Sequence, residues 1–322
     1  MQDHIGRSID YIRVSVTDRC NLRCRYCMPE EGVPLLRHED ILRFEEIAAF
    51  LRVAVAEGIV HVRLTGGEPL HRPGIVDLVR MLTEIPGLKD LSMTTNGTLL
   101  PPLAADLRRA GLQRINIGLP SLDPAIYAAL TRFGSLDQAL AGVQSALDAG
   151  FDPVKLNVVV LRGINDSLAP YVELTKRWPV AVRFIEYMSI GPLGEEHSLV
   201  PAAEIRTMLE NLGPLEPAEK PAGNGPARVY WRVPGAPGSL AVIAPMTEHF
   251  CPECNRLRLV ADGHLRMCLF GAEEIDIRPA LRPAVDEQAL RGLLVARAMQ
   301  EKPICMPDSI RDYGRAMGSI GG

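Results

Sequence analysis

From the N-terminus to about residue 190, short β-rich runs alternate with longer amphipathic segments, and this repeat is the feature that most constrains the fold. The β-rich runs are 12–16, 61–65, 90–95, 114–119, 154–160 and 181–186. The segments 44–57, 73–84 and 136–149 carry apolar residues at helical spacing, with Gly or Pro near their ends. Repeated βα units build a parallel sheet covered by helices. The pattern predicts an α/β fold, a partial (β/α)6 barrel of the TIM type, whose active site follows the C-terminal ends of the strands.

A cysteine-rich run follows the first predicted strand. Cys20, Cys24 and Cys27 stand in the sequence Cys-Asn-Leu-Arg-Cys-Arg-Tyr-Cys. Three thiolates fill three corners of a cubane iron–sulfur cluster and leave one iron with an open position. An open position is typical of a cluster that takes part in chemistry, so this run indicates an enzyme. A zinc site or a set of buried thiols is the alternative interpretation.

Two more unusual turns follow the next two predicted strands. Residues 65–69 read Thr-Gly-Gly-Glu-Pro, and residues 94–97 read Thr-Thr-Asn-Gly. Because glycine has no Cβ, the backbone of the Gly66-Gly67 turn can approach a ligand closely. The distinctive sequence therefore collects where the predicted fold would place an active site.

The βα repeat ends near Gly191, and a second cysteine group lies beyond it. Residues 214–237 are rich in Pro, Gly and Ala and indicate a linker with one strand-like patch at 228–233. The second group is Cys251, Cys254 and Cys268, and His264 between the last two also allows a structural zinc site. We divide the chain into a barrel over 1–237 and a C-terminal extension over 238–322.

Composition narrows the compartment and the partners. The 322 residues carry a net charge of −4 and contain no apolar run of membrane-spanning or secretory type, so we expect a cytoplasmic protein without nucleic-acid or membrane partners. In that compartment the seven cysteines favour thiolate ligands over disulfides. Cys305 has no partner spacing and is predicted to be a buried or idle thiol.

The ordered motifs resemble a known family. The spacing Cys20-x3-Cys24-x2-Cys27, with Tyr26 before the third cysteine and Gly-Gly-Glu-Pro at 66–69, resembles the radical S-adenosylmethionine (radical SAM) enzymes. Within that superfamily, the runs at 15–21, 94–97 and 183–186, the second cysteine group and the terminal Gly-Gly are similar to the GTP 3′,8-cyclases of molybdenum cofactor biosynthesis. The similarity extends from about residue 7 to the last residue.

This resemblance implies two [4Fe–4S] clusters, one on each cysteine triplet, together with S-adenosylmethionine as cofactor and GTP as substrate. It places five residues at S-adenosylmethionine: Tyr26, Gly67, Glu68, Gly118 and Met188. It places eight at GTP: Arg13, Arg63, Thr94, Lys155, Arg183, Arg256, Leu257 and Arg258. Several cations converging on one cavity are what a triphosphate requires. Beyond the six cysteines, only Arg13, Arg256 and Arg258 are implied in the chemistry.

The resemblance also implies the reaction and its partners. A 5′-deoxyadenosyl radical abstracts hydrogen from C3′ of GTP, and the carbon radical attacks C8 of guanine to give (8S)-3′,8-cyclo-7,8-dihydroguanosine 5′-triphosphate. The second cluster binds the guanine end of the substrate. We expect an external electron donor of the flavodoxin kind, a downstream cyclic pyranopterin monophosphate synthase, and a possible homodimer.

Two positions depart from the family pattern. Gly118-Leu119-Pro120 stands where the family has Ser-Leu-Asp, so a serine hydroxyl at the cofactor ribose is missing, at a cost of about 1 kcal/mol. His61 replaces a lysine beside Arg63 and supplies only part of its charge. For the terminal 319–322, a flexible tail and a sulfur-carrier end are alternatives; the family implies a tail that enters the active site and organises its arginines.

Two other functions remain open from the residues. Another radical SAM enzyme, acting on a peptide with an auxiliary cluster, would share the N-terminal half. A non-enzymatic metal-binding or electron-carrier protein would share the cysteines.

Overall fold

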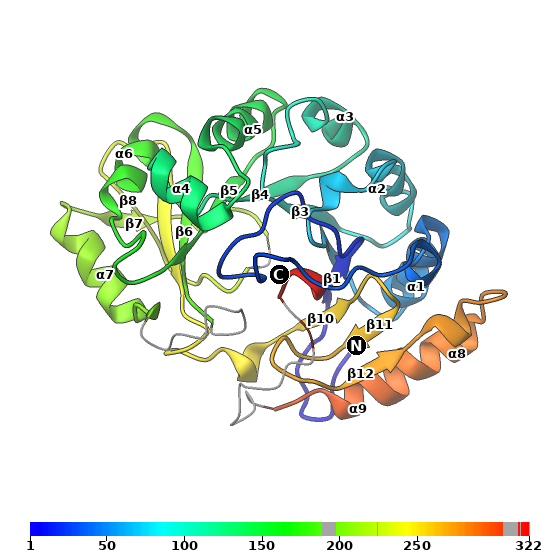
Figure 1. The fold of residues 1–322 in the computed structure, drawn as a ribbon. Coiled ribbons are helices and arrows are strands. Elements are labelled where there is room, and N and C mark those ends of the chain that lie inside the picture. Colours follow the sequence, from blue (N-terminus) through cyan, green and yellow to red (C-terminus); the bar gives the residue numbers. More distant parts are fainter. Residues whose placement is uncertain (189–197, 224, 305–314, 316, 322) are drawn as a thin grey trace.

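A strongly curved sheet forms the centre of the computed structural model, which describes residues 1–188, 198–223, 225–304, 315 and 317–321 (Figure 1). Within these residues the sheet has twelve strands. Their order is β12-β11-β10-β1-β2-β3-β4-β5-β6-β9-β8-β7.

The six predicted strands are confirmed, with ends that differ by one residue at most. They lie in chain order and pair in parallel, as a (β/α)6 unit requires. Their bounds are β1 Tyr11–Ser15, β2 His61–Thr65, β3 Asp90–Thr95, β4 Arg114–Gly118, β5 Val154–Val160 and β6 Val180–Glu186.

Two strands from the C-terminal part extend this sheet in parallel. β9 (Ser239–Ile243) pairs with β6, and β10 (Arg256–Leu259) pairs with β1, so eight consecutive strands of the described sheet are parallel. Antiparallel strands complete both edges: β7 (Glu216–Ala218) and β8 (Tyr230–Arg232) on one side, β11 (His264–Arg266) and β12 (Glu274–Asp276) on the other. The predicted strand patch at 228–233 is confirmed as β8, whereas the linker interpretation overlooked β7. The division at 237/238 stays a prediction, and three strand pairings cross it: β1 with β10, β6 with β9, and β8 with β9.

Helices cover the outer face of the sheet (Figure 1). The helices expected at 44–57, 73–84 and 136–149 are confirmed as α1, α2 and α5. The helix bounds are α1 Phe44–Ala56, α2 Ile75–Thr83, α3 Ala104–Arg109, α4 Pro124–Thr131, α5 Leu136–Asp148, α6 Ala169–Arg177, α7 Ala202–Asn211, α8 Glu287–Arg291 and α9 Met299–Glu301, with a π-helical segment Gly292–Ala298 between the last two.

The strands separate an apolar outer face from a polar inner one. Ile12 and Val14 are fully buried in the main core, and Arg13 between them lines an interior cavity. Because successive strand residues point to opposite faces, one strand supplies both the core and the cavity. The fold thus places polar side chains inside the curve.

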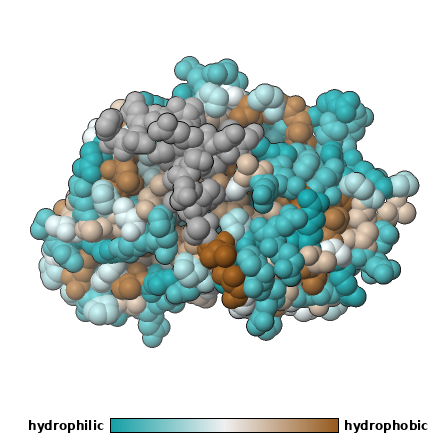
Figure 2. Space-filling model, turned by 90° about the horizontal axis from the view of Figure 1, so that it is seen from below, coloured by the Kyte–Doolittle hydropathy of each residue, from teal (hydrophilic) through white to brown (hydrophobic). Residues whose placement is uncertain are grey.

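Outside the grey residues, hydrophilic residues predominate on the face shown in Figure 2, and a small group of hydrophobic ones lies near its centre. No helix within the described ranges is both long and apolar enough to cross a membrane.

A buried carboxylate joins the first helix to the C-terminal part. Glu46, in the first turn of α1, accepts hydrogen bonds from the Arg43 backbone N–H at 2.6 Å and from Arg282 Nε at 2.7 Å. Arg282 also donates to the backbone oxygens of Glu39 and Ile41. Burial alone would raise the pKa of Glu46, but the hydrogen bonds from Arg282 and Arg43 lower it to about 2.

We expect Glu46→Gln to destabilise the fold by about 2 kcal/mol at neutral pH, because the variant leaves the Arg282 guanidinium without its carboxylate partner. The hydrogen bonds from Arg282 to the backbone oxygens of Glu39 and Ile41 remain and limit the loss. Since the folded-state pKa lies below the ordinary value of 4.5, the stabilisation is complete above pH 4.5 and is lost as the pH falls toward 2. Urea unfolding of the cluster-free chain at about pH 7 and about pH 3 measures this. An equal difference between wild type and variant at both pH values would contradict the assignment.

Candidate active site

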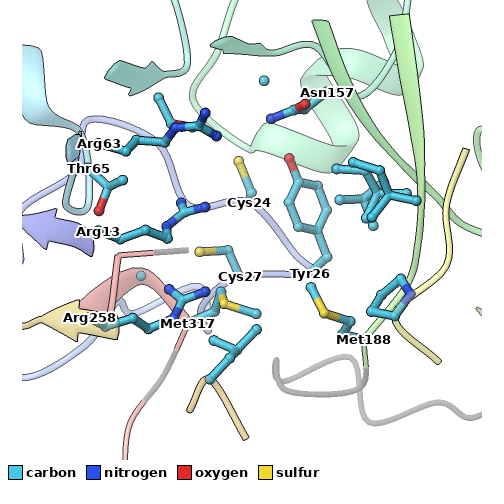
Figure 3. A pocket seen from close by; sticks show the side chains of 18 of the residues that line it. Arg13, Cys24, Tyr26, Cys27, Arg63, Thr65, Asn157, Met188, Arg258 and Met317 are labelled. Atoms are coloured by element: carbon cyan, nitrogen blue, oxygen red, sulfur yellow. The ribbon is translucent and has the colours of Figure 1, made fainter. Parts of the chain in front are cut away.

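A cavity of about 370 Å³ lies inside the curved sheet, and both cysteine triplets line it (Figure 3). The cavity brings together most residues singled out from the sequence. Those on its wall are Arg13, Cys20, Cys24, Tyr26, Cys27, Arg63, Gly67, Glu68, Thr94, Gly118, Arg183, Met188, Cys251, Cys254, Arg256, Arg258 and Cys268.

The triplets reach the cavity from opposite ends of two neighbouring strands. Cys20 follows the C-terminal end of β1, whereas Cys254 precedes the N-terminal end of β10. Because β1 and β10 are parallel and in register, with Tyr11 beside Arg256, the two cysteine loops are separated by about the length of a strand. Four or five residues at about 3.3 Å each amount to roughly 15 Å, which is room for a nucleotide between them.

Three arginines form a row across adjacent strands between these ends. Arg13 is directly opposite Arg258 on β10 and Arg63 on β2, and Figure 3 shows the three side chains extending in the same direction. Like charges opposite one another in a sheet are destabilising. Burial and the neighbouring Arg266 and Arg256 lower the pKa of Arg258 to about 10, and burial with Arg258 and Arg63 lowers the pKa of Arg13. A bound polyanion would relieve this repulsion.

Neutral groups contact two of the arginines on the cavity wall, Arg63 and Arg183. Arg63 Nε donates to Ser92 Oγ at 3.1 Å, and its guanidinium lies 5.5 Å from the centre of the Tyr11 ring. Arg183 Nη2 donates to Asn116 Oδ1 at 2.7 Å and to Asn157 Oδ1 at 2.6 Å. Side-chain amides and hydroxyls orient a guanidinium without neutralising it, so its charge stays available to an anionic ligand.

Three predicted residues do not line the cavity. Lys155 is buried, its Nζ donates to the backbone oxygen of Ala222 at 2.7 Å, and burial with nearby arginines lowers its pKa to about 6. Leu257 is fully buried in the main core, because it alternates with Arg256 and Arg258 along β10. His61 faces Asp90, with 3.4 Å from Nδ1 to Oδ2.

The Gly-Gly-Glu-Pro turn packs directly on the first cysteine loop. The backbone N–H groups of Gly67 and Glu68 donate to the carbonyls of Thr17 and Arg19, each at 2.8 Å. A Cβ at Gly67 would lie 2.4 Å from the Arg19 oxygen. The close approach that requires glycine is therefore to the cysteine loop, whereas the sequence interpretation assigned it to a ligand.

Glu68 is organised by the next strand. Its carboxylate accepts hydrogen bonds from Thr95 Oγ1 at 2.7 Å, from the Asn96 N–H at 2.7 Å and from the Leu70 N–H at 3.0 Å. Burial raises its pKa to about 7 in spite of these bonds. The carboxyl is thus held rigidly at the cavity wall, close to the first triplet.

The chemistry of the first triplet fits an iron–sulfur cluster. Burial raises the pKa of Cys20 to about 12 and that of Cys24 to about 11, and it also raises the pKa of Cys27. Such thiols need the positive charge of bound metal to become thiolate ligands. No three Cys, His, Asp or Glu side chains in the described part of the chain lie close enough to hold a single metal ion.

His264, the fourth ligand that a structural zinc site at the second triplet would use, is engaged elsewhere. His264 Nδ1 lies 2.9 Å from Asp262 Oδ1, and this contact raises the pKa of the imidazole. Burial would raise the pKa of Cys254, but the charges of Lys302 and Arg256 lower it overall. The three cysteines face the cavity without His264.

The C-terminal residues lie in the same place. Met317 and Gly318 line the cavity, and Arg258 Nη1 donates to the backbone oxygens of Ile320 at 3.3 Å and Gly321 at 3.0 Å. Gly321 has φ +77°, and a Cβ there would lie 2.3 Å from Thr65 Oγ1. The expectation that the tail enters the site and contacts its arginines is consistent with these contacts. Cys305 and Gly322 lie outside the described residues.

Sequence reasoning overlooked several residues that support the site. Asn116 and Asn157 hold Arg183, and Arg7 and Lys302 contact the second cysteine group. One signal was present: arginine supplies nearly all basic residues, and Lys302 is one of five lysines.

Comparisons with known proteins give two family matches that together span most of the chain. The radical SAM superfamily matches residues 14–174, and the family described as Molybdenum Cofactor Synthesis C matches residues 180–305. Proteins named GTP 3′,8-cyclase from Moorella thermoacetica and Pelotomaculum thermopropionicum are each 49% identical to the chain, with 100% of both chains covered. The cyclase of Geobacter sulfurreducens is 48% identical over 91% of each chain.

Among solved structures, Streptococcus suis SuiB bound to S-adenosylmethionine has a similar fold. The TM-score is 0.65 over 95% of this chain and 77% of that chain, at 13% sequence identity. The likeness confirms the predicted fold class.

Gly67→Ala tests the contact between the Gly-Gly-Glu-Pro turn and the cysteine loop. The methyl group must displace Arg19, and such overpacking costs about 1–3 kcal/mol. We expect less iron on the first triplet after anaerobic reconstitution, measured by iron and sulfide content. Gly292→Ala is the matched control because its Cβ would meet nothing within 4 Å. Equal iron in both variants would refute the contact's importance.

Proposed function

The chain belongs to the radical SAM superfamily and, within it, to the family of GTP 3′,8-cyclases, and from this we propose that its two cysteine triplets serve the two ends of one GTP-binding cavity. The protein is an enzyme of molybdenum cofactor biosynthesis that cyclises GTP to (8S)-3′,8-cyclo-7,8-dihydroguanosine 5′-triphosphate. The observation that carries the proposal is the cavity wall, which combines both triplets with the arginine row.

The first triplet holds a [4Fe–4S] cluster and S-adenosylmethionine, the cofactors of the superfamily. When bound, these groups supply the carbon radical that removes hydrogen from the substrate. In the proposal Cys20, Cys24 and Cys27 ligate the cluster. The wall around them forms the S-adenosylmethionine site and comprises Tyr26, Gly67, Glu68, Gly118 and Met188.

The second triplet holds a second [4Fe–4S] cluster in this proposal. Cys251, Cys254 and Cys268 supply three ligands, and the fourth position accepts the guanine end of GTP. Their place at the opposite end of β1 and β10 from the first triplet supports this role, since the base and the radical source must lie on two sides of the ribose.

The arginine row binds the triphosphate between the two cysteine triplets. Arg13, Arg63 and Arg258 line the cavity in register on three adjacent strands, and guanidinium groups are suitable partners for phosphate oxygens. Arg183, Arg256 and Thr94 extend the same wall. Lys155 contributes after exchanging the Ala222 carbonyl for phosphate, and Leu257 contributes through its main chain only.

The C-terminal residues exclude water from the reacting groups. Ile320 is 1% exposed and Met317 is 8% exposed, and both pack beside Cys27 and Met188. A dry cavity protects a radical intermediate and strengthens the phosphate contacts. The proposal also includes a one-electron donor of the flavodoxin kind, a cyclic pyranopterin monophosphate synthase that uses the product, a possible homodimer and a cytoplasmic location.

The decisive experiment is anaerobic incubation of the reconstituted protein with S-adenosylmethionine, a strong reductant and each nucleoside triphosphate in turn. We expect 5′-deoxyadenosine and a cyclised product with GTP alone. The absence of both products would refute the proposed function.

Cys24→Ser and Cys268→Ser separate the roles of the triplets. Serine at Cys24 should abolish even uncoupled cleavage of S-adenosylmethionine, whereas serine at Cys268 should spare cleavage and remove the GTP-derived product. Chromatography of both products measures this. Equal loss of cleavage in the two variants would be incompatible with the division of roles.

Gly118→Ser tests the departure from the family pattern. A Cβ at Gly118 would lie 3.9 Å from its nearest neighbour, the Thr95 oxygen, so serine fits without strain. One restored hydrogen bond is worth about 1 kcal/mol, and we expect S-adenosylmethionine to bind up to about tenfold more tightly. Equilibrium dialysis with the reconstituted protein measures the affinity. Gly118→Ala, which adds the Cβ without the hydroxyl, should leave it unchanged.

A further inference from the structure

One buried ammonium group joins the two chain segments that carry the second triplet. Lys302 is 2% exposed, and its Nζ donates to the backbone oxygens of Arg256 and Met267, each at 2.7 Å. The same Nζ lies 3.8 Å from Cys254 Sγ, within hydrogen-bond distance for sulfur. Arg256 follows Cys254 by two residues, and Met267 directly precedes Cys268. A single cation therefore contacts both halves of the triplet.

A second buried cation fixes the remaining cysteine and the segment around Lys302. Arg7 Nη1 donates to the backbone oxygen of Cys251 at 2.8 Å, and Nη2 donates to that of Pro303 at 2.7 Å. Asp3 pairs with Arg7 at 2.5 Å and compensates its charge. In the described part of the chain, Lys302 Nζ contacts the Cys254 sulfur and the two backbone oxygens, so its charge is directed at these three acceptors.

We propose that Lys302 is a positioning residue for the second iron–sulfur cluster, which sets the separation of the Cys254 and Cys268 loops and donates a charged hydrogen bond to a ligand sulfur. This inference rests on the proposed function, since it takes the second triplet to hold a cluster. Hydrogen bonds to sulfur and local positive charge both raise the reduction potential of a cluster. Lys302 therefore stabilises the reduced state and the assembled loop together.

The shape of the side chain explains why lysine stands here. An ammonium group has three donors around one nitrogen, and the three acceptors surround a single point. The planar fork of arginine directs its donors along a plane and cannot place all three on these acceptors. Arginine at this position keeps the charge but loses part of the geometry.

The test uses the full-length chain with Cys20, Cys24 and Cys27 all replaced by alanine, so that bound iron reports on the second triplet alone. This parent and its Lys302→Met, Lys302→Gln and Lys302→Arg variants are reconstituted anaerobically. Iron and sulfide content, the EPR spectrum of the reduced cluster and its midpoint potential are measured. Lys89→Met is the matched control, because Lys89 is exposed.

We expect Lys302→Met to lose at least half of the bound iron and to shift the potential of the remaining cluster to more negative values. Lys302→Gln should show a smaller loss of iron, and Lys302→Arg a potential closer to the parent than that of Lys302→Met. The unfolding temperature of the cluster-free chains separates a general folding defect from a loss at the site. If all three Lys302 variants unfold at a lower temperature than the parent and their folded fraction gives parent-like spectra, the inference is overturned.

Parent-like iron content, EPR spectrum and potential in Lys302→Met would likewise overturn it. Failure of the parent itself to assemble a cluster, while wild type cleaves S-adenosylmethionine, would contradict the second cluster of the proposed function and this inference with it. Cleavage by wild type tests the first triplet independently, so the two failures are distinguishable.

Discussion

The parallel pairing of β10 with β1 is the contact on which the rest of the site depends. It joins a strand near the C-terminus to the first strand of the βα repeat and places Arg258 directly beside Arg13. Because the strands run in the same direction, a cysteine loop before β10 and a cysteine loop after β1 lie at opposite ends of one cavity. Without this pairing, the two triplets would not line the same cavity.

The pairing also creates an electrostatic cost. Three arginines in register repel one another, and burial removes the water that would screen them. Neutral acceptors offset part of this cost: the Ser92 hydroxyl accepts from Arg63, and the backbone carbonyls of Ile320 and Gly321 accept from Arg258. The Asn116 and Asn157 amides hold the nearby Arg183 in the same way. These partners hold the guanidinium groups in place without neutralising them. A cavity built in this way is prepared for a polyanion, and the tail residues take part in that preparation.

Sequence reasoning succeeded where the signal was local. The six strands and the helices at 44–57, 73–84 and 136–149 follow from periodicity, which is set by neighbouring residues. The strands β9 and β10 were not predicted, because both lie beyond the βα repeat and each pairs with a strand that is distant in the sequence. Leu257 was assigned to the GTP site by resemblance, but successive residues of a strand point to opposite faces. Its neighbours Arg256 and Arg258 face the cavity, so the Leu257 side chain faces the core. Lys302 was missed because its acceptors lie 35 to 48 residues away and two of them are backbone oxygens, which leave no pattern in the side chains.

The sequence by itself determined the chemistry: two cysteine triplets of fixed spacing, a glycine-rich turn after the second strand and an excess of arginine on the strands. Those features are local, and ligand type and strand periodicity can be read from them. Only the tertiary structure decided that both triplets face one cavity, that Gly67 is required by the cysteine loop, and that Arg13, Arg63 and Arg258 stand in register. These facts depend on contacts between segments that are distant in the sequence, up to the more than 200 residues between Arg13 and Arg258, and no short stretch of sequence carries a signal for them.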